Sequence, residues 1–200
     1  MFQRLFATRL YSAGLPRGLM RDLETASLAI AEGDRAGQRW AKAHGYKGYT
    51  SYASLDDLTL RDPAFAALEQ QLGDHIAAFA REVDFDLGRR KLAMDSLWVN
   101  VMTRGAVHAP HIHPHAVISG TVYVNAPPGA GAIRFEDPRL PMMMAAPPRK
   151  ANAKPDNKTF VTLRPRAGTL LLWESWLRHG VETNEARTPR ISVSFNYRLD

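Results

Sequence analysis

Four histidines fall within one eight-residue segment of the sequence, at His108, His111, His113 and His115. The segment precedes an apolar run at residues 117–125 and is expected to be extended, so that residues two apart point to the same side. His111 and His113 could therefore bind one metal ion together. His108 and His115 are expected to be solvated or hydrogen-bonded in a loop, and no role is predicted for them.

A third imidazole stands far along the chain, at His179, shortly after the apolar run at residues 169–173. Neutral imidazoles suit iron, zinc, copper and nickel, and open positions on one face of such a site are what oxygen-activating non-haem iron needs. The chain has no cysteine, so nitrogen and oxygen atoms must hold any metal ion. A near pair and a distant histidine thus predict a metal site at His111, His113 and His179.

Polar and apolar residues alternate in the run that begins at Arg190, eleven residues after His179. The polar positions are Arg190, Ser192, Ser194 and Asn196, and the apolar positions are Ile191, Val193, Phe195 and Tyr197. A polar face on a core strand is unusual unless something polar lies inside the fold. A guanidinium beside a hydroxyl can hold a carboxylate, because its planar donors reach both oxygens.

Helical patterns precede these residues and strand patterns surround them. Apolar residues recur at helical spacing over residues 15–30, after a first strand that leads into the helix at Pro16, and again over residues 62–83. After Arg90 the period changes to two. Six runs predict strands, at residues 96–102, 117–125, 132–135, 159–163, 169–173 and 190–197. Helices followed by strands favour helices packed on one face of an antiparallel sandwich or barrel.

Two segments show no regular period. Residues 34–57 are predicted to be an irregular connection whose aromatic side chains cover the core. The proline-rich residues 138–155 include three methionines and are long for a loop. Such loops are often lids or binding loops, and a loop without a role is the equal alternative.

Length and composition exclude several classes of protein. At 200 residues and 45% hydrophobic residues, the chain is expected to form a single domain with a real core. No apolar stretch approaches the length of a membrane span. The net charge of +6 is spread along the chain without interleaved aromatic residues, so nucleic-acid binding is not expected. The arginine-rich first 21 residues only weakly imitate a mitochondrial presequence, and a cytoplasmic protein is expected.

Beyond these patterns, an ordered set of motifs resembles a known family, the small 2-oxoglutarate/Fe(II)-dependent oxygenases. The motifs are His-Ile-His-Pro at 111–114, Ile-Ser-Gly-Thr-Val-Tyr-Val at 118–124, Phe-Glu-Asp-Pro-Arg at 135–139, Gly-Thr-Leu-Leu-Leu-Trp-Glu-Ser at 168–175 with His179, and Arg-Ile-Ser-Val-Ser-Phe-Asn at 190–196. Segments around Trp98 and Tyr49 are also similar, so the resemblance extends over most of the chain. The full ordered set is far more specific than any one motif.

The resemblance implies a fold and a set of roles. The fold is a double-stranded β-helix, a cupin-like jelly-roll of the mainly β or α+β class, with N-terminal helices packed on its major sheet. It implies one oxygenase-like domain over residues 1–200, mostly helical over 1–90 and with the β-helix core over 91–200. His111 and His179 correspond to Fe(II) ligands, and Arg190 with Ser192 corresponds to the site of 2-oxoglutarate. Two further residues, Tyr123 and Asn100, are weaker candidates for contacts with this cosubstrate.

The third metal ligand departs from the wider superfamily, whose motif is His-x-Asp or His-x-Glu. His113 occupies the carboxylate position, so the site loses one negative charge. His113 is the favoured ligand. The alternatives are another group such as Asp137, or two protein ligands completed by water.

The implied reaction is oxidative decarboxylation of 2-oxoglutarate by dioxygen to succinate and carbon dioxide, with hydroxylation of a small-molecule or peptide substrate. The alternative is a cupin-like protein that binds a metal ion or ligand without turnover. The sequence leaves open the substrate, the role of the loop at 138–155 and the oligomeric state, for which a homodimer is one option.

Overall fold

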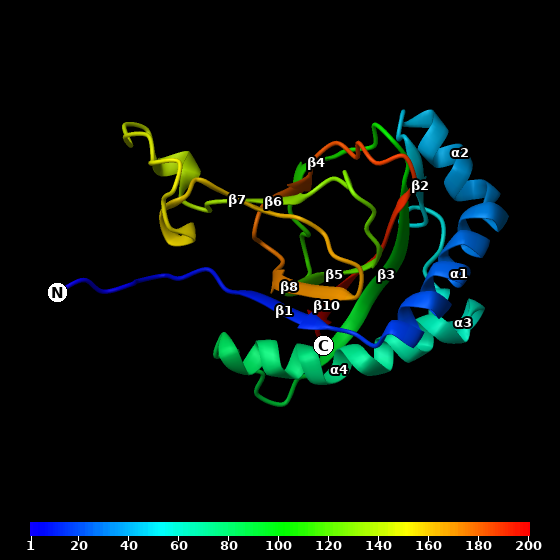
Figure 1. Cartoon of the computed structure of the whole chain (residues 1–200). Helices are drawn as coiled ribbons and strands as arrows, with labels where there is room; N and C mark the ends of the chain where they lie inside the picture. Colours follow the sequence, from blue (N-terminus) through cyan, green and yellow to red (C-terminus); the bar gives the residue numbers. More distant parts are fainter.

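Ten strands form two antiparallel sheets in the computed structural model, which describes residues 1–200. The strands are β1 (Leu10–Gly14), β2 (Gly48–Thr50), β3 (Leu92–Met102), β4 (His108–His111), β5 (Ile118–Asn125), β6 (Ile133–Glu136), β7 (Phe160–Leu163), β8 (Thr169–Glu174), β9 (His179–Val181) and β10 (Arg190–Leu199). The larger sheet has the order β1-β8-β5-β10-β3-β2, and the smaller sheet has the order β4-β9-β6-β7. The two sheets face one another (Figure 1).

The strand order is that of a double-stranded β-helix. From β3 to β10 the chain passes back and forth between the sheets, with β3, β5, β8 and β10 in the larger one and β4, β6, β7 and β9 in the smaller one. Strand β10 lies between β3 and β5 and pairs with both. Residues near position 100 and residues near position 190 are therefore brought into one interior.

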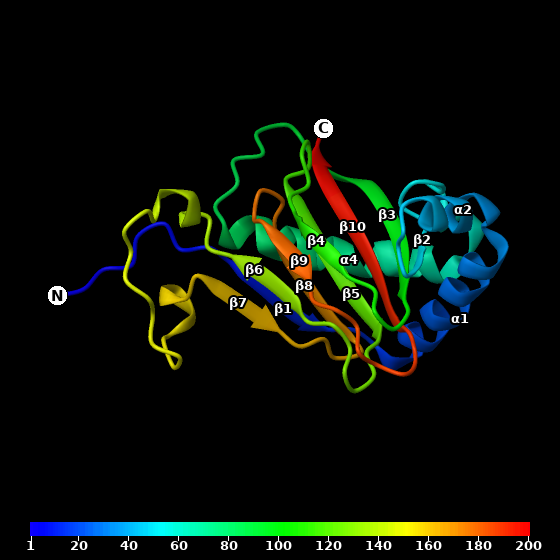
Figure 2. The same ribbon diagram turned by 90° about the horizontal axis from the view of Figure 1, so that it is seen from above.

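Four helices cover the outer face of the larger sheet (Figures 1 and 2). They are α1 (Arg17–Gly33), α2 (Arg35–Ala43), α3 (Leu58–Arg61) and α4 (Pro63–Glu82). Helix α4 begins after Asp62, whose side chain accepts a hydrogen bond from the backbone N–H of Ala64 at 2.9 Å. Its apolar stripe is buried in a core of 25 residues between the helices and the sheet. The two helices and the first strand predicted from the sequence are confirmed.

The prediction of an irregular connection over residues 34–57 is wrong, because this segment contains α2 and β2. Helix α2 buries only Gly37 and Ala41, so it shows no apolar period in the sequence. Asp34 caps it by accepting a hydrogen bond from the N–H of Gly37 at 3.0 Å. The same carboxylate accepts hydrogen bonds from Tyr49 at 2.8 Å and from Ser54. Hydrogen bonds to Asp34 stabilise the start of this helix, and the spacing of apolar residues in the sequence does not predict such bonds.

The predicted strands are present with small changes in their ends, and β4 and β9 are additional. Both additional strands are short, and β4 lies within the histidine-rich segment, where no alternation of apolar residues marks it. The alternation predicted for β10 is correct. Its apolar residues join the core under the helices, and its polar residues face the space between the sheets.

The proline-rich loop between β6 and β7 contains two short turns, η1 (Leu140–Met142) and η2 (Pro155–Asn157). The loop lies beside the extended N-terminal arm (Figures 1 and 2), and Arg4 pairs with Asp156 at 3.2 Å. Met142 and Met144 are exposed. No helix combines the length and the apolar character needed to cross a membrane.

Candidate active site

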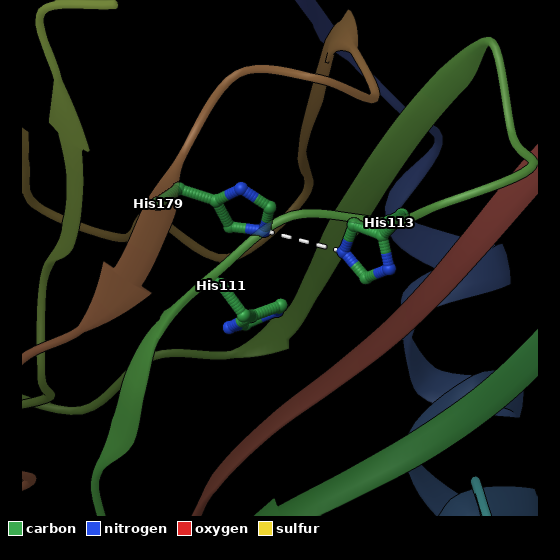
Figure 3. A group of neighbouring side chains, drawn as sticks. All are labelled: His111, His113 and His179. Atoms are coloured by element: carbon green, nitrogen blue, oxygen red, sulfur yellow. Dashed lines mark hydrogen bonds between the residues drawn. The ribbon is translucent and has the colours of Figure 1, made fainter.

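Three histidine side chains meet between the ends of the two sheets (Figure 3). His111 ends β4, His179 begins β9, and these two residues are direct partners in the β4–β9 pair. His113 follows two residues later, where its backbone N–H donates to the carbonyl oxygen of Ser175 at 3.1 Å. One ring nitrogen from each histidine lies within 4.8 Å of the other two. The structure thus brings together the three residues that the sequence predicts as metal ligands.

Burial keeps two of the three rings neutral, and backbone carbonyls orient His111 and His179 as electron-pair donors. Burial lowers the pKa of His179 to about 3, and burial together with the charge of His111 lowers the pKa of His113 to about 4. The Nδ1 atoms of His179 and His111 lie 2.8 Å and 2.7 Å from the carbonyl oxygens of Leu177 and Ala109. An Nδ1–H donated to each carbonyl leaves Nε2 free to bind a metal ion. The Nε2 atoms of His113 and His179 are 3.3 Å apart.

Arg190 is buried in the same interior without an acidic partner. It is 2% exposed, and its Nη1 atom contacts the sulfur of Met102 at 3.0 Å and the hydroxyl of Ser192 at 3.4 Å. The guanidinium lies 4.9 Å from the centre of the Tyr123 ring. Its Nε atom has no hydrogen-bond acceptor. A buried charge without a counter-ion is costly, so this position is suited to receive an anion.

Tyr123 and Asn100 lie beside this guanidinium and its neighbour Ser192. The hydroxyl of Tyr123 is buried without a partner, and burial raises its pKa. Asn100 is the strand partner of Ser192 and donates a hydrogen bond to Ser194 at 3.3 Å, while its own oxygen has no partner. All four residues predicted to bind the cosubstrate therefore lie in one region of the barrel.

Other candidates lie outside the histidine cluster. Asp137 is held by Arg139 through two hydrogen bonds of 3.0 Å and 2.8 Å, so it is engaged elsewhere. His115 is exposed. His108 is hydrogen-bonded, as one of the two expectations for it states: its Nε2 atom lies 2.6 Å from the hydroxyl of Tyr46. Burial and the charge of Arg190 lower the pKa of His108 to about 3.

Two tryptophans flank the cluster, and no sequence pattern predicts either of them there. The ring centre of Trp98 lies 5.8 Å from that of His113, and the ring centre of Trp173 lies 4.7 Å from that of His179. The run at residues 169–173 is apolar at nearly every position, so the sequence hides which side chains point inward. The structure shows Leu171 on the inner face, and period-two alternation then places Trp173 on the same face.

The residues present fit an Fe(II) ion and a dicarboxylate. Three neutral nitrogen donors suit a divalent first-row metal ion and leave coordination positions open. Four of the five buried polar side-chain atoms without a partner lie in this interior and can hydrogen-bond a polar guest: Tyr123 Oη, Arg190 Nε, Asn100 Oδ1 and Trp173 Nε1. The fifth, Ser27 Oγ, lies on α1.

Comparison with known families agrees with this geometry. Residues 96–196, half of the chain, match the model of the family described as "Putative 2OG-Fe(II) oxygenase". The chain belongs to this family of 2-oxoglutarate- and Fe(II)-dependent oxygenases, which are oxidoreductases. The family's cofactors, Fe(II) and 2-oxoglutarate, are those that the sequence motifs imply, and dioxygen is the second cosubstrate of such enzymes. No curated protein matches the sequence.

Solved structures share the fold. SnoN, an epimerase from nogalamycin biosynthesis crystallised with Fe3+, alpha ketoglutarate and nogalamycin RO, aligns with a TM-score of 0.66 and 16% identity over 96% of this chain and 79% of SnoN. HygX from Streptomyces hygroscopicus, with nickel and 2-oxoglutarate bound, aligns with a TM-score of 0.63 and 16% identity over 96% and 82% of the two chains.

A third relative is longer than this chain. An oxidoreductase of the 2OG-Fe(II) oxygenase family from Burkholderia pseudomallei aligns with a TM-score of 0.50 and 16% identity over 68% of this chain, which spans 58% of that protein. At such identities the likeness shows the fold, and it confirms the predicted double-stranded β-helix.

Proposed function

We propose that this protein is a working dioxygenase that couples decarboxylation of 2-oxoglutarate to hydroxylation of a small-molecule or peptide substrate. One oxygen atom of dioxygen enters succinate and the other enters the substrate, with release of carbon dioxide. The observation that carries the proposal is the buried Arg190, which has no acidic partner and lies in the same barrel as the histidine cluster. A guanidinium kept without a counter-ion indicates a site for a bound carboxylate.

In this proposal His111, His113 and His179 hold Fe(II), which supplies the oxidising chemistry when dioxygen binds. Arg190 and Ser192 hold the carboxylate of 2-oxoglutarate that lies farther from the metal ion. Tyr123 covers the guanidinium with its ring and offers a hydroxyl, and Asn100 offers a free amide oxygen. The protein's part is to fix these groups, exclude water and orient the substrate carbon.

Because all three proposed ligands are neutral, the centre keeps the full charge of the divalent ion until an anion binds. The superfamily pattern with one carboxylate would lower that charge by one. We propose that residues 1–200 act as one domain and that the enzyme works in the cytoplasm.

The test is formation of succinate that depends on 2-oxoglutarate, together with metal binding, in Arg190→Ala and in the wild-type protein. Hydrogen bonds to charged groups contribute about 1.5–3 kcal/mol each, so the variant should lose roughly 100-fold or more in succinate formation. Metal affinity should stay nearly unchanged, because Arg190 does not belong to the histidine cluster. Arg104→Ala is the matched control, since Arg104 is exposed and only 3.9 Å from Glu185 in a surface pair.

The second candidate is a cupin-like protein that binds a metal ion or ligand without turnover. It predicts metal binding and no succinate even from the wild-type protein. Anaerobic addition of 2-oxoglutarate to the Fe(II)-loaded protein should give the weak visible charge-transfer band of the chelated cosubstrate. Absence of that band would favour the binding protein.

A further inference from the structure

Trp173 is a buried hydrogen-bond donor without an acceptor at the edge of the histidine cluster. It lies near the end of β8 and is 2% exposed. Its side chain faces the interior with Tyr123 and Phe135, whereas its strand neighbour Leu172 faces the helices. The indole ring centre is 4.7 Å from that of His179, and the Nε1 atom has no partner.

This arrangement is unfavourable unless a ligand completes it. An indole N–H that leaves water without a new acceptor loses its hydrogen bond to solvent. A phenylalanine ring would fill an apolar position without that loss. Trp98, on the other flank of the cluster, does not share the problem, because its nitrogen is not among the buried atoms without a partner. The unpartnered donor therefore distinguishes the His179 side of the cluster.

No carboxylate side chain belongs to the three-histidine cluster. The proposed ligands are three imidazoles, and the nearest candidate acids are engaged, with Asp137 bound to Arg139 and Glu136 paired with Arg178 at 3.5 Å. A 2-oxoglutarate dianion has two carboxylates, and Arg190 can neutralise only the one that lies beside it. The other carboxylate would lie beside the histidine cluster, where the metal ion supplies its counter-charge and the Trp173 Nε1–H is an unused donor.

We propose that the Trp173 Nε1–H donates a hydrogen bond to the carboxylate of 2-oxoglutarate that binds beside the histidine cluster, an inference that rests on the proposed function. Trp173 is thus a cosubstrate-binding residue. The two carboxylates are received at two places in the barrel interior, by a guanidinium at Arg190 and by a neutral indole at Trp173. A neutral donor can orient an anion without adding positive charge to a centre that already holds an uncompensated divalent ion.

The first test is anaerobic titration of the Fe(II)-loaded protein with 2-oxoglutarate, followed by its charge-transfer band. Loss of one hydrogen bond to a charged group should weaken binding roughly 10- to 100-fold in Trp173→Phe and move the band. Fe(II) affinity should be unchanged. Trp98→Phe is the matched control, because it removes the other indole beside the cluster and should keep the wild-type affinity and band.

A second measurement uses the wild-type protein, in case Trp173→Phe does not fold. The chain has four tryptophans, so an indole N–H spectrum of the Zn(II)-loaded, 15N-labelled protein should contain four signals. Phenylalanine variants of Trp40, Trp98 and Trp176 assign the Trp173 signal by exclusion. Addition of 2-oxoglutarate should move that signal downfield and slow its exchange with solvent.

The outcomes separate this inference from the function beneath it. If the wild-type protein gives no charge-transfer band, the proposed function fails and this inference fails with it. If the band forms but Trp173→Phe binds 2-oxoglutarate as tightly as the wild type, or the Trp173 signal stays unmoved, only the role of Trp173 is overturned. Weaker binding confined to Trp173→Phe, or the downfield shift in the wild-type spectrum, supports it.

Discussion

His111 and His179 are direct partners across the antiparallel pair of β4 and β9, although 68 residues separate them in the chain (179 minus 111). Strand pairing thus sets the distance between two imidazoles, and the same pair places His113 just beyond the end of β4. A shift of one residue in this register would turn one of the two rings away from the interior. The geometry of the candidate centre is therefore a property of the smaller sheet.

Removal of any ring in the cluster should abolish tight metal binding. His179→Ala and His113→Ala are expected to weaken binding of Fe(II) or Ni(II) more than about 100-fold. Mutating a residue that only hydrogen-bonds to a metal ligand already lowers metal affinity by about 10- to 100-fold. Calorimetric titration measures the affinity. His115→Ala is the control, since that residue is exposed and outside the cluster. Equal affinity in His179→Ala would refute the proposed ligand set.

The identity of the third ligand can be decided by two substitutions. Asp137→Asn should leave metal affinity unchanged, because the carboxylate is held by Arg139 at 2.8 Å and lies outside the cluster. His113→Asp should keep the metal binding that His113→Ala loses, because a carboxylate can also ligate iron. Loss of the metal ion in Asp137→Asn would show that Asp137, and not His113, completes the site.

Mild acid should lower the free energy of unfolding of the metal-free protein, because it contains a buried neutral histidine. Burial lowers the pKa of His108 to about 3 from the ordinary value of 6.5. The unfolded chain therefore takes up a proton at a higher pH than the folded chain, so stability falls as pH drops below about 6.5 and continues to fall towards about 3. Each such histidine contributes up to about 1.4 kcal/mol per pH unit in that window.

Urea unfolding at pH 7, 6 and 5 in the presence of a chelator measures how steeply the free energy of unfolding changes with pH. His108→Gln should reduce the slope, whereas His44→Gln on the exposed end of α2 should leave it as in the wild type. Identical slopes in His108→Gln and wild type would mean that His108 titrates normally in the folded protein.

Two glycines should respond to alanine in opposite directions. A Cβ atom at Gly120 in β5 would lie 2.4 Å from Cζ of Phe195 and 2.7 Å from Cδ2 of Leu172, so Gly120→Ala should cost about 1–3 kcal/mol. Gly73 in α4 has nothing within 4 Å of that position, so Gly73→Ala should stabilise by about 0.5–1 kcal/mol. Thermal melting of both variants checks the signs. If Gly120→Ala were as stable as the wild type, the side chains of Phe195 and Leu172 would have to shift at little cost in free energy.

The sequence predicts what repeats at a fixed period or stands in an ordered motif. Helix α4 was predictable because its stripe at Phe65, Leu68 and Leu72 is long and regular, and β10 was predictable because its alternation is strict. The histidine cluster could be predicted because His111 and His113 lie close in sequence and His179 follows an apolar strand. The ordered motifs then placed these residues in a known family.

Contacts between distant polar residues could not be predicted in this way. The start of helix α2 depends on Asp34, whose hydrogen-bond partners Tyr49 and Ser54 lie 15 and 20 residues further along the chain. No sequence motif links these three residues. The pairing of Tyr46 with His108 joins residues 62 positions apart. The lack of a hydrogen-bond acceptor for the Trp173 indole nitrogen can be recognised only from the structure around it. These contacts arise from tertiary packing, which leaves no periodic pattern in the amino-acid sequence.

The position of β10 has a consequence for folding. The last strand of the chain is hydrogen-bonded between β3 and β5, and it carries Arg190. Its pairings join residues of high sequence separation, and such contacts form slowly. The site for a dicarboxylate is therefore completed only after β10 has been synthesised and has paired with β3 and β5. A truncated polypeptide that ends before Arg190 would still contain all three histidines, but its larger sheet would lack the strand that joins β3 to β5.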